Sequence, residues 1–313
     1  MRIATWNVNS MKARLEKIEW WLDRAAPDVL LMQETKLSDS DAPVMTFQMA
    51  GYQLVHHGEG RWNGVAIAVR DGISIDEPIT NFGDGPVRNT GAGASVSLEE
   101  DDFDPAHEAR MLSIRVADPN AHGVAADPIR VVSLYAPNGR VVDSAFYHGK
   151  LRWFARARRW LDATRDPGEA LVIGGDLNIA PADIDVWNAR AVHGGTHVSE
   201  PERAAFRNLL DWGLHDAFRD VHPDTRGRFT WWDYRAGNFH KNFGMRIDHL
   251  LPTSSVASRV VAVEIDREAR KGKPIPSDHA PLVLDLDVAG KLFDPGWEDA
   301  EARIVARGGI RPR

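Results

Sequence analysis

The chain contains no cysteine among its 313 residues. This absence excludes disulfides, thiolate catalysis and a zinc site with cysteine ligands. The sequence also has no apolar run that approaches the roughly 18 residues of a membrane-spanning helix. Its start, MRIATWNVN, lacks the charged and then apolar order of a signal peptide. We therefore expect a soluble protein of the cytoplasm that does not act at a membrane.

The chain also has fewer positive than negative side chains: it contains 38 Lys and Arg and 45 Asp and Glu, which give a net charge of −7. Proteins that bind nucleic acid without sequence preference tend to be basic. The charge is uneven, however. Six carboxylates fall between Glu99 and Glu108, whereas the segment 235–246 is basic and contains no acid. Since the local field matters more than the total, nucleic acid stays a candidate partner.

The apolar fraction of 43% supports a sizeable core, in one large α/β domain or two smaller ones. Strand and helix patterns are mixed from end to end, and no linker divides them. We expect a single domain over residues 1–290 and a C-terminal tail over 291–313 that is partly disordered. The irregular, acidic segment 81–128 is expected to hold a long loop or a hairpin extension.

Short polar motifs follow several apolar runs, where a strand end can hold a side chain in a fixed place. They carry carboxylates, amides, a tyrosine and an imidazole, the groups expected of a metal-assisted hydrolytic site. The motifs are WNVN at 6–9, QETK at 33–36, YAPN at 135–138, GDLN at 175–178, RIDH at 246–249 and SDH at 277–279.

In this order, the motifs resemble the exonuclease III-type apurinic/apyrimidinic (AP) endonucleases of the endonuclease/exonuclease/phosphatase superfamily. The resemblance runs from Met1 to about Asp287 and includes WNVNSMKAR, DVLLMQETK, WNGVAI, LYAPNG, GGDLNIAP, FTWWDYR, RIDHLL and SDHAPL. It implies a four-layered α/β sandwich, with two mixed β-sheets packed face to face and helices outside. Residues 1–290 would then form one catalytic domain, with its site where strand ends of both sheets meet.

The resemblance identifies Asn7 and Glu34 as the pair that holds the metal. Mg²⁺ prefers hard oxygen ligands, which a carboxylate and an amide supply, and Mn²⁺ is the expected substitute. The bland alternatives are a turn residue for Asn7 and an ordinary strand-end acid for Glu34. Four further residues complete the candidate metal-binding set: Asp176, Asn178, Asp278 and His279.

The catalytic roles also follow from the resemblance. Asp176 would orient or deprotonate the attacking water, and Asn178 would bind a non-bridging phosphate oxygen. Asp248 is the expected partner of His279, because an imidazole needs a carboxylate to fix its tautomer and stabilise its cation. Whether Asp176 or His279 is the general base stays open. Tyr135 would contact the phosphate.

Substrate contacts are expected around an aromatic and basic segment. Trp231 occupies the family's pocket position, while Trp232 is assigned to the core because neighbouring strand residues face opposite sides. By the same alternation, His249 is assigned a packing role. The basic segment 235–246 is expected to contact the DNA backbone. The candidate substrate-binding residues are Trp231, Arg235, Lys241, Asn9 and Asn138.

The resemblance implies a monomeric, Mg²⁺-dependent DNA-repair phosphodiesterase, associated with the nucleoid when it acts on DNA. It would cleave 5′ of abasic sites and act on duplex 3′ ends as a 3′→5′ exonuclease and 3′-phosphodiesterase. Two alternatives stay open. One is the same chemistry on a phosphoinositide or sphingolipid, or as a non-specific nuclease. The other is a non-catalytic binding module, which would have lost one or more of the polar residues.

Overall fold

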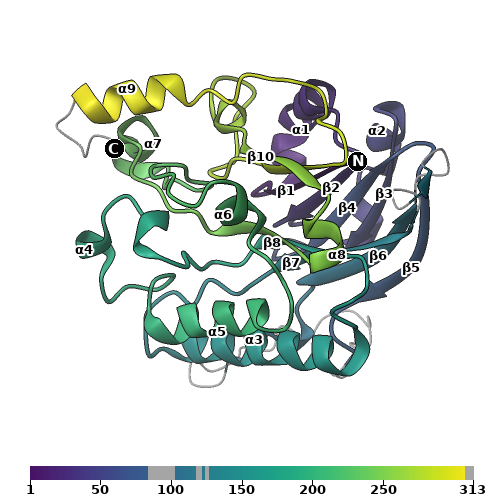
Figure 1. Ribbon diagram of the computed structural model, residues 1–313, viewed down its shortest axis with the longest axis horizontal. Helices are drawn as coiled ribbons and strands as arrows, with labels where there is room; N and C mark the ends of the chain where they lie inside the picture. The colour runs from purple at the N-terminus through teal and green to yellow at the C-terminus, as the bar shows by residue number, and fades with distance from the viewer. Residues whose placement is uncertain (84–102, 118–121, 124–126, 307–313) are drawn as a thin grey trace.

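The computed structural model describes residues 1–83, 103–117, 122–123 and 127–306. Within these ranges, two mixed sheets of six and five strands pack against each other, and helices cover their outer faces (Figure 1). The predicted four-layered α/β sandwich is confirmed. The acidic positions 99–102 lie outside the described residues.

The first sheet has the strand order β10-β11-β1-β2-β4-β3. β1 and β2 are parallel, and the other neighbouring strands pair antiparallel. Its strands are β1 (Arg2–Asn7), β2 (Val29–Gln33), β3 (Tyr52–His57), β4 (Val65–Arg70), β10 (Val260–Ile265) and β11 (Leu282–Leu286).

The second sheet has the order β5-β6-β7-β8-β9. β7 and β8 are parallel, whereas β9 runs antiparallel to β8. Its strands are β5 (Ser74–Thr80), β6 (Met111–Ala117), β7 (Ile129–Tyr135), β8 (Leu171–Asp176) and β9 (Asp248–Pro252).

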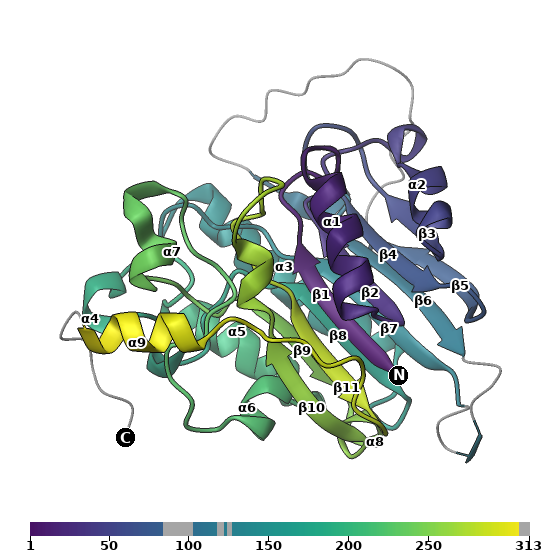
Figure 2. The ribbon, with the colours of Figure 1, turned by 90° about the horizontal axis from the view of Figure 1, so that it is seen from above.

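Helices cover both sheets on the outside (Figure 2). α1 begins after Ser10, whose side chain accepts a hydrogen bond from the amide of Ala13, and it packs on the first sheet. α3 and α5 cover the second sheet. The α-helices are α1 (Met11–Ala25), α2 (Val44–Met49), α3 (Ala145–Thr164), α4 (Ala189–Val192), α5 (Glu200–Leu210), α6 (Ala217–Val221), α7 (Asn238–Lys241), α8 (Ser254–Ala257) and α9 (Glu298–Ala306).

The alternation of side chains along each central strand explains why the sheets are covered on both faces. In β2, Leu31 packs between the two sheets, whereas Leu30 and Met32 pack under α1. Gly174 in β8 is part of the same interface, because a Cβ at this position would lie 2.5 Å from Cδ1 of Leu31. The sheets can approach closely here only because β8 carries a glycine.

Two segments with the alternating pattern of strands differ from that pattern in the structure. Residues 229–234 form no ladder, and Trp231 makes only isolated bridges to Met245 and His279. In the segment 256–265 the strand begins at Val260, because α8 precedes it. Part of the predicted tail is helical: α9 lies within it, and Ala300 packs in the core. The last seven positions, 307–313, lie outside the described residues.

Candidate active site

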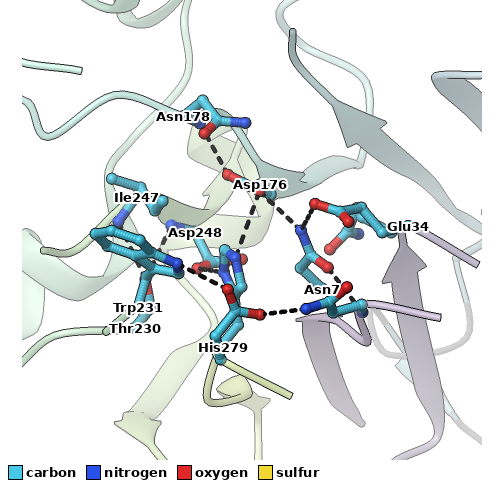
Figure 3. A network of polar contacts seen from close by, with 12 residues as sticks. Asn7, Glu34, Asp176, Asn178, Thr230, Trp231, Ile247, Asp248 and His279 are labelled. Carbon is cyan, nitrogen blue, oxygen red and sulfur yellow. Dashed lines mark hydrogen bonds and ion pairs between the residues drawn. The ribbon is translucent and has the colours of Figure 1, made fainter. Parts of the chain in front are cut away.

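The register of the strands brings polar side chains to one edge of the sandwich (Figure 3). In the second sheet, Tyr135 at the end of β7 pairs with Asp176 at the end of β8, and Asp176 pairs with Asp248 at the start of β9. In the first sheet, Asn7 ends β1 and Glu34 directly follows β2. Residues far apart in the sequence therefore meet, because the ends of the parallel strands and the start of the antiparallel strand β9 lie at the same edge.

His279 lies between two buried carboxylates. Its Nδ1 is 2.8 Å from Oδ2 of Asp248, and its Nε2 is 3.8 Å from Oδ2 of Asp176. Burial alone would lower the pKa of the imidazole, but attraction to Asp248 and Asp176 outweighs burial and raises the pKa to about 10. The ring is therefore a cation at neutral pH, held in place by Asp248.

Asp176 is a buried carboxylate whose negative charge is poorly stabilised. Burial raises its pKa to about 7, and nearby Asp248 and Glu34 act in the same direction against the attraction of His279. Its Oδ2 accepts a hydrogen bond of 2.9 Å from Nδ2 of Asn7, and its Oδ1 accepts one from the amide of Asn178. A carboxylate with a pKa near the operating pH is suited to accept a proton.

Glu34 is ionised, although it is largely surrounded by protein. Burial would raise its pKa, but the charge of Lys36 and hydrogen bonds from Asn7 and Lys36 hold it below its ordinary value. Oε1 accepts hydrogen bonds from Nδ2 of Asn7 at 2.8 Å and from the hydroxyl of Tyr135 at 2.9 Å. Oε2 lies 2.8 Å from Nζ of Lys36.

Tyr135 acts here as a neutral donor. Burial and the neighbouring carboxylate of Glu34 raise the pKa of the phenol well above its ordinary value. The guanidinium of Arg110 lies 4.6 Å from the centre of its ring and opposes that shift only in part. Tyr135 therefore holds Glu34 in place through a proton that it retains.

A divalent cation fits this donor set best at Glu34. The carboxylate supplies hard oxygens, and its Oε2 already faces a cation in the ammonium group of Lys36. The amide of Asn7 donates to Glu34 and Asp176, while its Oδ1 accepts from the amide of Asn9. In this orientation Asn7 positions both carboxylates.

Asp176, Asp248 and His279 also lie close enough to hold a metal, since one ligand atom from each falls within 4.8 Å of the others. Their electrostatics favour a different role. The imidazolium of His279 already balances the two carboxylates, and a metal there would have to displace its proton. One carboxylate atom, Oδ1 of Asp248, is buried without a hydrogen-bond partner.

Asn178 is held by a turn that only particular residues can form. Its φ is 53°, and Gly175 before it has a φ of 157°, where a Cβ would overlap the carbonyl of Leu134. The amide Nδ2 of Asn178 donates to the carbonyl of Ala136. Asn138 is exposed and donates from Nδ2 to Oδ1 of Asn178 at 3.3 Å.

Asp278 and Trp231 form the rim of the site. Oδ2 of Asp278 accepts a hydrogen bond of 3.1 Å from Nε1 of Trp231, and Oδ1 accepts one of 2.9 Å from Nδ2 of Asn9. Trp231 is partly exposed, whereas Trp232 is fully buried. An isolated bridge also pairs the backbones of Trp231 and His279. Asp278 thus connects the first motif of the sequence to the last.

The expected DNA contact along 235–246 needs a correction. Arg246 is fully buried and bonds Asp185 and Asp216, so this guanidinium is inaccessible to DNA. Arg235 is exposed but engages Asp233 through several hydrogen bonds. Lys241 is exposed, with Nζ 5.7 Å from the ring of Phe243.

Sequence reasoning gave no role to Lys36, although it stands in the QETK motif. Besides its contact with Glu34, its Nζ donates to Oδ1 of Asn9 at 2.6 Å. It therefore connects the metal-binding candidate to the rim. Its position in the sequence could have indicated this role, because Lys36 lies two residues after Glu34 on the loop that follows β2.

His249 faces away from the site and is fully buried. Nη1 of Arg246 donates to its Nδ1 at 3.0 Å, and its Nε2 donates to the carbonyl of Ile179 at 2.9 Å. Burial, together with the charge of Arg246, lowers the pKa of His249 from 6.5 to about 4. The imidazole is therefore neutral and has a packing and hydrogen-bonding role.

This lowered pKa predicts loss of stability in acid. Between pH 6.5 and about 4 the unfolded chain protonates His249 whereas the folded chain does not, so its contribution is full above 6.5 and is lost as the pH falls. Gln in place of His249 should reduce the drop in the free energy of unfolding between pH 7 and pH 5, measured by urea denaturation. His215→Gln, at an exposed histidine, is the matched control. An unchanged drop in folded His249→Gln would contradict the assignment.

In the described parts of the chain, no helix is long and apolar enough to cross a membrane.

Comparison with known proteins agrees with this geometry. The model of the Endonuclease/Exonuclease/phosphatase family matches residues 4–279. The chain is 30% identical to exodeoxyribonuclease III of Haemophilus influenzae over 290 residues, which cover 90% of this chain and 98% of the relative.

Two solved structures resemble the protein over 92% of this chain and all of theirs. One is an AP endonuclease from Archaeoglobus fulgidus, with a TM-score of 0.77 and 33% identity. The other is the 3′ phosphatase NExo from Neisseria bound to a product DNA hairpin, with a TM-score of 0.76 and 33% identity.

Proposed function

The chain belongs to the endonuclease/exonuclease/phosphatase family, and from this premise we propose that it is a Mg²⁺-dependent DNA-repair phosphodiesterase. It cleaves 5′ of abasic sites and removes nucleotides or blocking groups from 3′ ends of duplex DNA. Its relatives include an exodeoxyribonuclease, an AP endonuclease and a 3′ phosphatase. The site in this chain contains the groups that such a hydrolysis requires.

One observation carries the proposal. The imidazolium of His279 and the ionised carboxylate of Glu34 lie on either side of Asp176, whose pKa is about 7. Asn7 donates to both Asp176 and Glu34, so the two carboxylates keep a fixed separation. A proton acceptor between a cation and a metal-binding carboxylate suits the attack of water on a phosphodiester.

The side chains divide the reaction among them. Asp176 accepts the proton of the attacking water, and the fixed cation of His279 stabilises the charge that develops on the phosphoryl oxygens. Asp248 keeps that cation protonated and oriented. Asn178, held by its turn, orients a non-bridging oxygen with an amide N–H. Glu34 would hold a Mg²⁺ ion, which would supply further positive charge next to the phosphate.

Replacing Glu34 with glutamine should weaken activation by Mg²⁺. The substitution keeps the shape and an oxygen acceptor for Tyr135, but it removes the negative charge that a cation needs. Titrating cleavage rate against Mg²⁺ should show a curve displaced to higher concentration, or little activity throughout. Glu59→Gln, on the loop after β3, gives a control with the same change of charge. A Glu34→Gln curve that coincides with wild type would remove Glu34 from the metal site.

The substrate class is tested with a panel of labelled 3′-ends and lesions. Duplexes with one abasic site, with a 3′-phosphate and without damage are incubated with the protein and Mg²⁺, and the end groups of the products are identified. The proposal predicts a 3′-hydroxyl at the cut abasic site and removal of the 3′-phosphate. Hydrolysis of a phosphoinositide or of sphingomyelin, with no cleavage of any duplex, would replace the repair function with the alternative.

A further inference from the structure

Two arginines from distant segments converge on one tyrosine beside the candidate active site. Nη2 of Arg14, in α1, lies 3.1 Å from the hydroxyl of Tyr234. The guanidinium carbon of Arg270 lies 4.7 Å from the centre of the Tyr234 ring. It also lies 5.0 Å from the centre of the Phe239 ring. Two cations therefore contact one aromatic side chain.

Neither guanidinium has the partner that a buried charge normally has. Arg270 is 8% exposed, and the Nε atoms of Arg14 and Arg270 are both buried without a hydrogen-bond partner. Among the residues that the structure describes, no carboxylate forms an ion pair with either. Two other buried arginines differ: Arg2 lies 2.7 Å from Asp285, and Arg246 contacts both Asp185 and Asp216.

Convergence of like charges costs free energy unless an anion offsets it. Burial lowers the pKa of Arg270, and the nearby charge of Arg14 acts in the same direction, whereas Tyr234 and Asp278 oppose the shift only in part. The pair nevertheless reaches the surface, because Arg14 is partly exposed and Tyr234 is 47% exposed. An anion from solution can therefore approach Arg14, whose planar donors match the oxygens of a phosphate, and the charge of Arg270, which contacts the same tyrosine, adds to the attraction.

The pair also borders the candidate site. The hydroxyl of Tyr234 donates to the carbonyl of Pro276, two residues before the rim residue Asp278. Arg14 lies one helical turn after Ser10, and its neighbour Asn9 donates to Asp278. The two arginines thus lie next to the segment that carries the rim residue Asp278.

We propose that Arg14 and Arg270 form a second phosphate-binding site that holds a non-scissile backbone phosphate of the DNA substrate. This inference rests on the proposed function and adds a residue-level contact that fixes how the DNA lies on the enzyme. It also offers a way for a chain with a net charge of −7 to bind a polyanion, because the local field at two neighbouring arginines matters more than the total charge.

The test measures binding of an abasic duplex in an Asp176→Asn background, which prevents cutting. The apparent Kd is determined at several salt concentrations for the parent, Arg14→Gln, Arg270→Gln and the double variant. Losing one neutralised phosphate should lower the slope of log Kd against log salt by about one in the double variant. Each single variant should weaken binding at a fixed salt concentration.

Arg115→Gln is the matched control, because it removes the same charge from a half-exposed arginine of β6, towards the end of its sheet remote from the site. Thermal denaturation reports folding. If Arg270→Gln fails to fold, the affinity and salt slope of Arg14→Gln alone decide the test, since Arg14 is the less buried of the two. A folded Arg14→Gln protein whose affinity and slope both match Arg115→Gln overturns the second phosphate site. If the parent itself binds no duplex, the proposed function fails instead, and this inference fails with it.

Discussion

Replacing Asp176 with asparagine should reduce cleavage of an abasic duplex by roughly 10²- to 10⁴-fold, the range that general acid–base catalysis contributes. Asparagine fills the same space and can still accept from Asn7 and from the amide of Asn178, but it cannot take a proton from water. The rate of the chemical step, measured in a single turnover with enzyme in excess, is the appropriate readout.

Duplex binding should survive this substitution, because it removes negative charge near a polyanion. Asp183→Asn provides the control, since Asp183 is an exposed carboxylate on the segment that follows the same motif. Single-turnover rates that stay within a few-fold of wild type in folded Asp176→Asn would exclude Asp176 as the proton acceptor and leave that role to another group.

Asp248→Asn should cost on the order of 10²-fold or more in the same assay. The neutral amide removes the charge that contributes most to the raised pKa of His279, about 10 in the native site. His279 stays protonated up to about pH 10 in the wild type. Removing the charge of Asp248 should lower the pKa of His279, so the alkaline loss of activity should shift to lower pH. A full pH–rate profile measures this shift.

A double variant separates a positioning role from a merely structural one. If Asp248 acts only through the imidazole, Asp248→Asn combined with His279→Gln should be no slower than His279→Gln alone. Additive losses in folded proteins, or an alkaline limb of the Asp248→Asn profile that does not move, would contradict the proposed pairing. The backbone of Asp248 is fixed independently by Thr230, whose hydroxyl accepts from its amide.

The strand-end residues could be placed from sequence because their positions depend on local pattern. An apolar run followed by a polar motif marks where a buried strand ends, and parallel neighbours such as β1 and β2 end at the same edge. Asn7 and Glu34 could therefore be assigned to one edge, although 27 positions separate them.

Other features depend on tertiary contacts that no local pattern reveals. The basic segment 235–246 gave no sign that Arg246 is buried, because its partners Asp185 and Asp216 lie 61 and 30 positions away. The aromatic run 229–234 has the composition of a strand, yet Trp231 forms isolated bridges in place of a ladder and donates a hydrogen bond to Asp278. The contact of Lys36 with Asn9 likewise required the loops to be seen together.

The most direct test of a metal-assisted phosphodiesterase site uses one labelled duplex with a single abasic site and an undamaged duplex of the same sequence. Wild-type protein and Asp176→Asn are each incubated with Mg²⁺ and with EDTA. We predict a single cut 5′ of the abasic site by wild type with Mg²⁺, little cutting with EDTA, and almost none by Asp176→Asn in either condition. Equal cleavage by wild type in Mg²⁺ and EDTA, or wild-type cleavage by Asp176→Asn, would contradict the account.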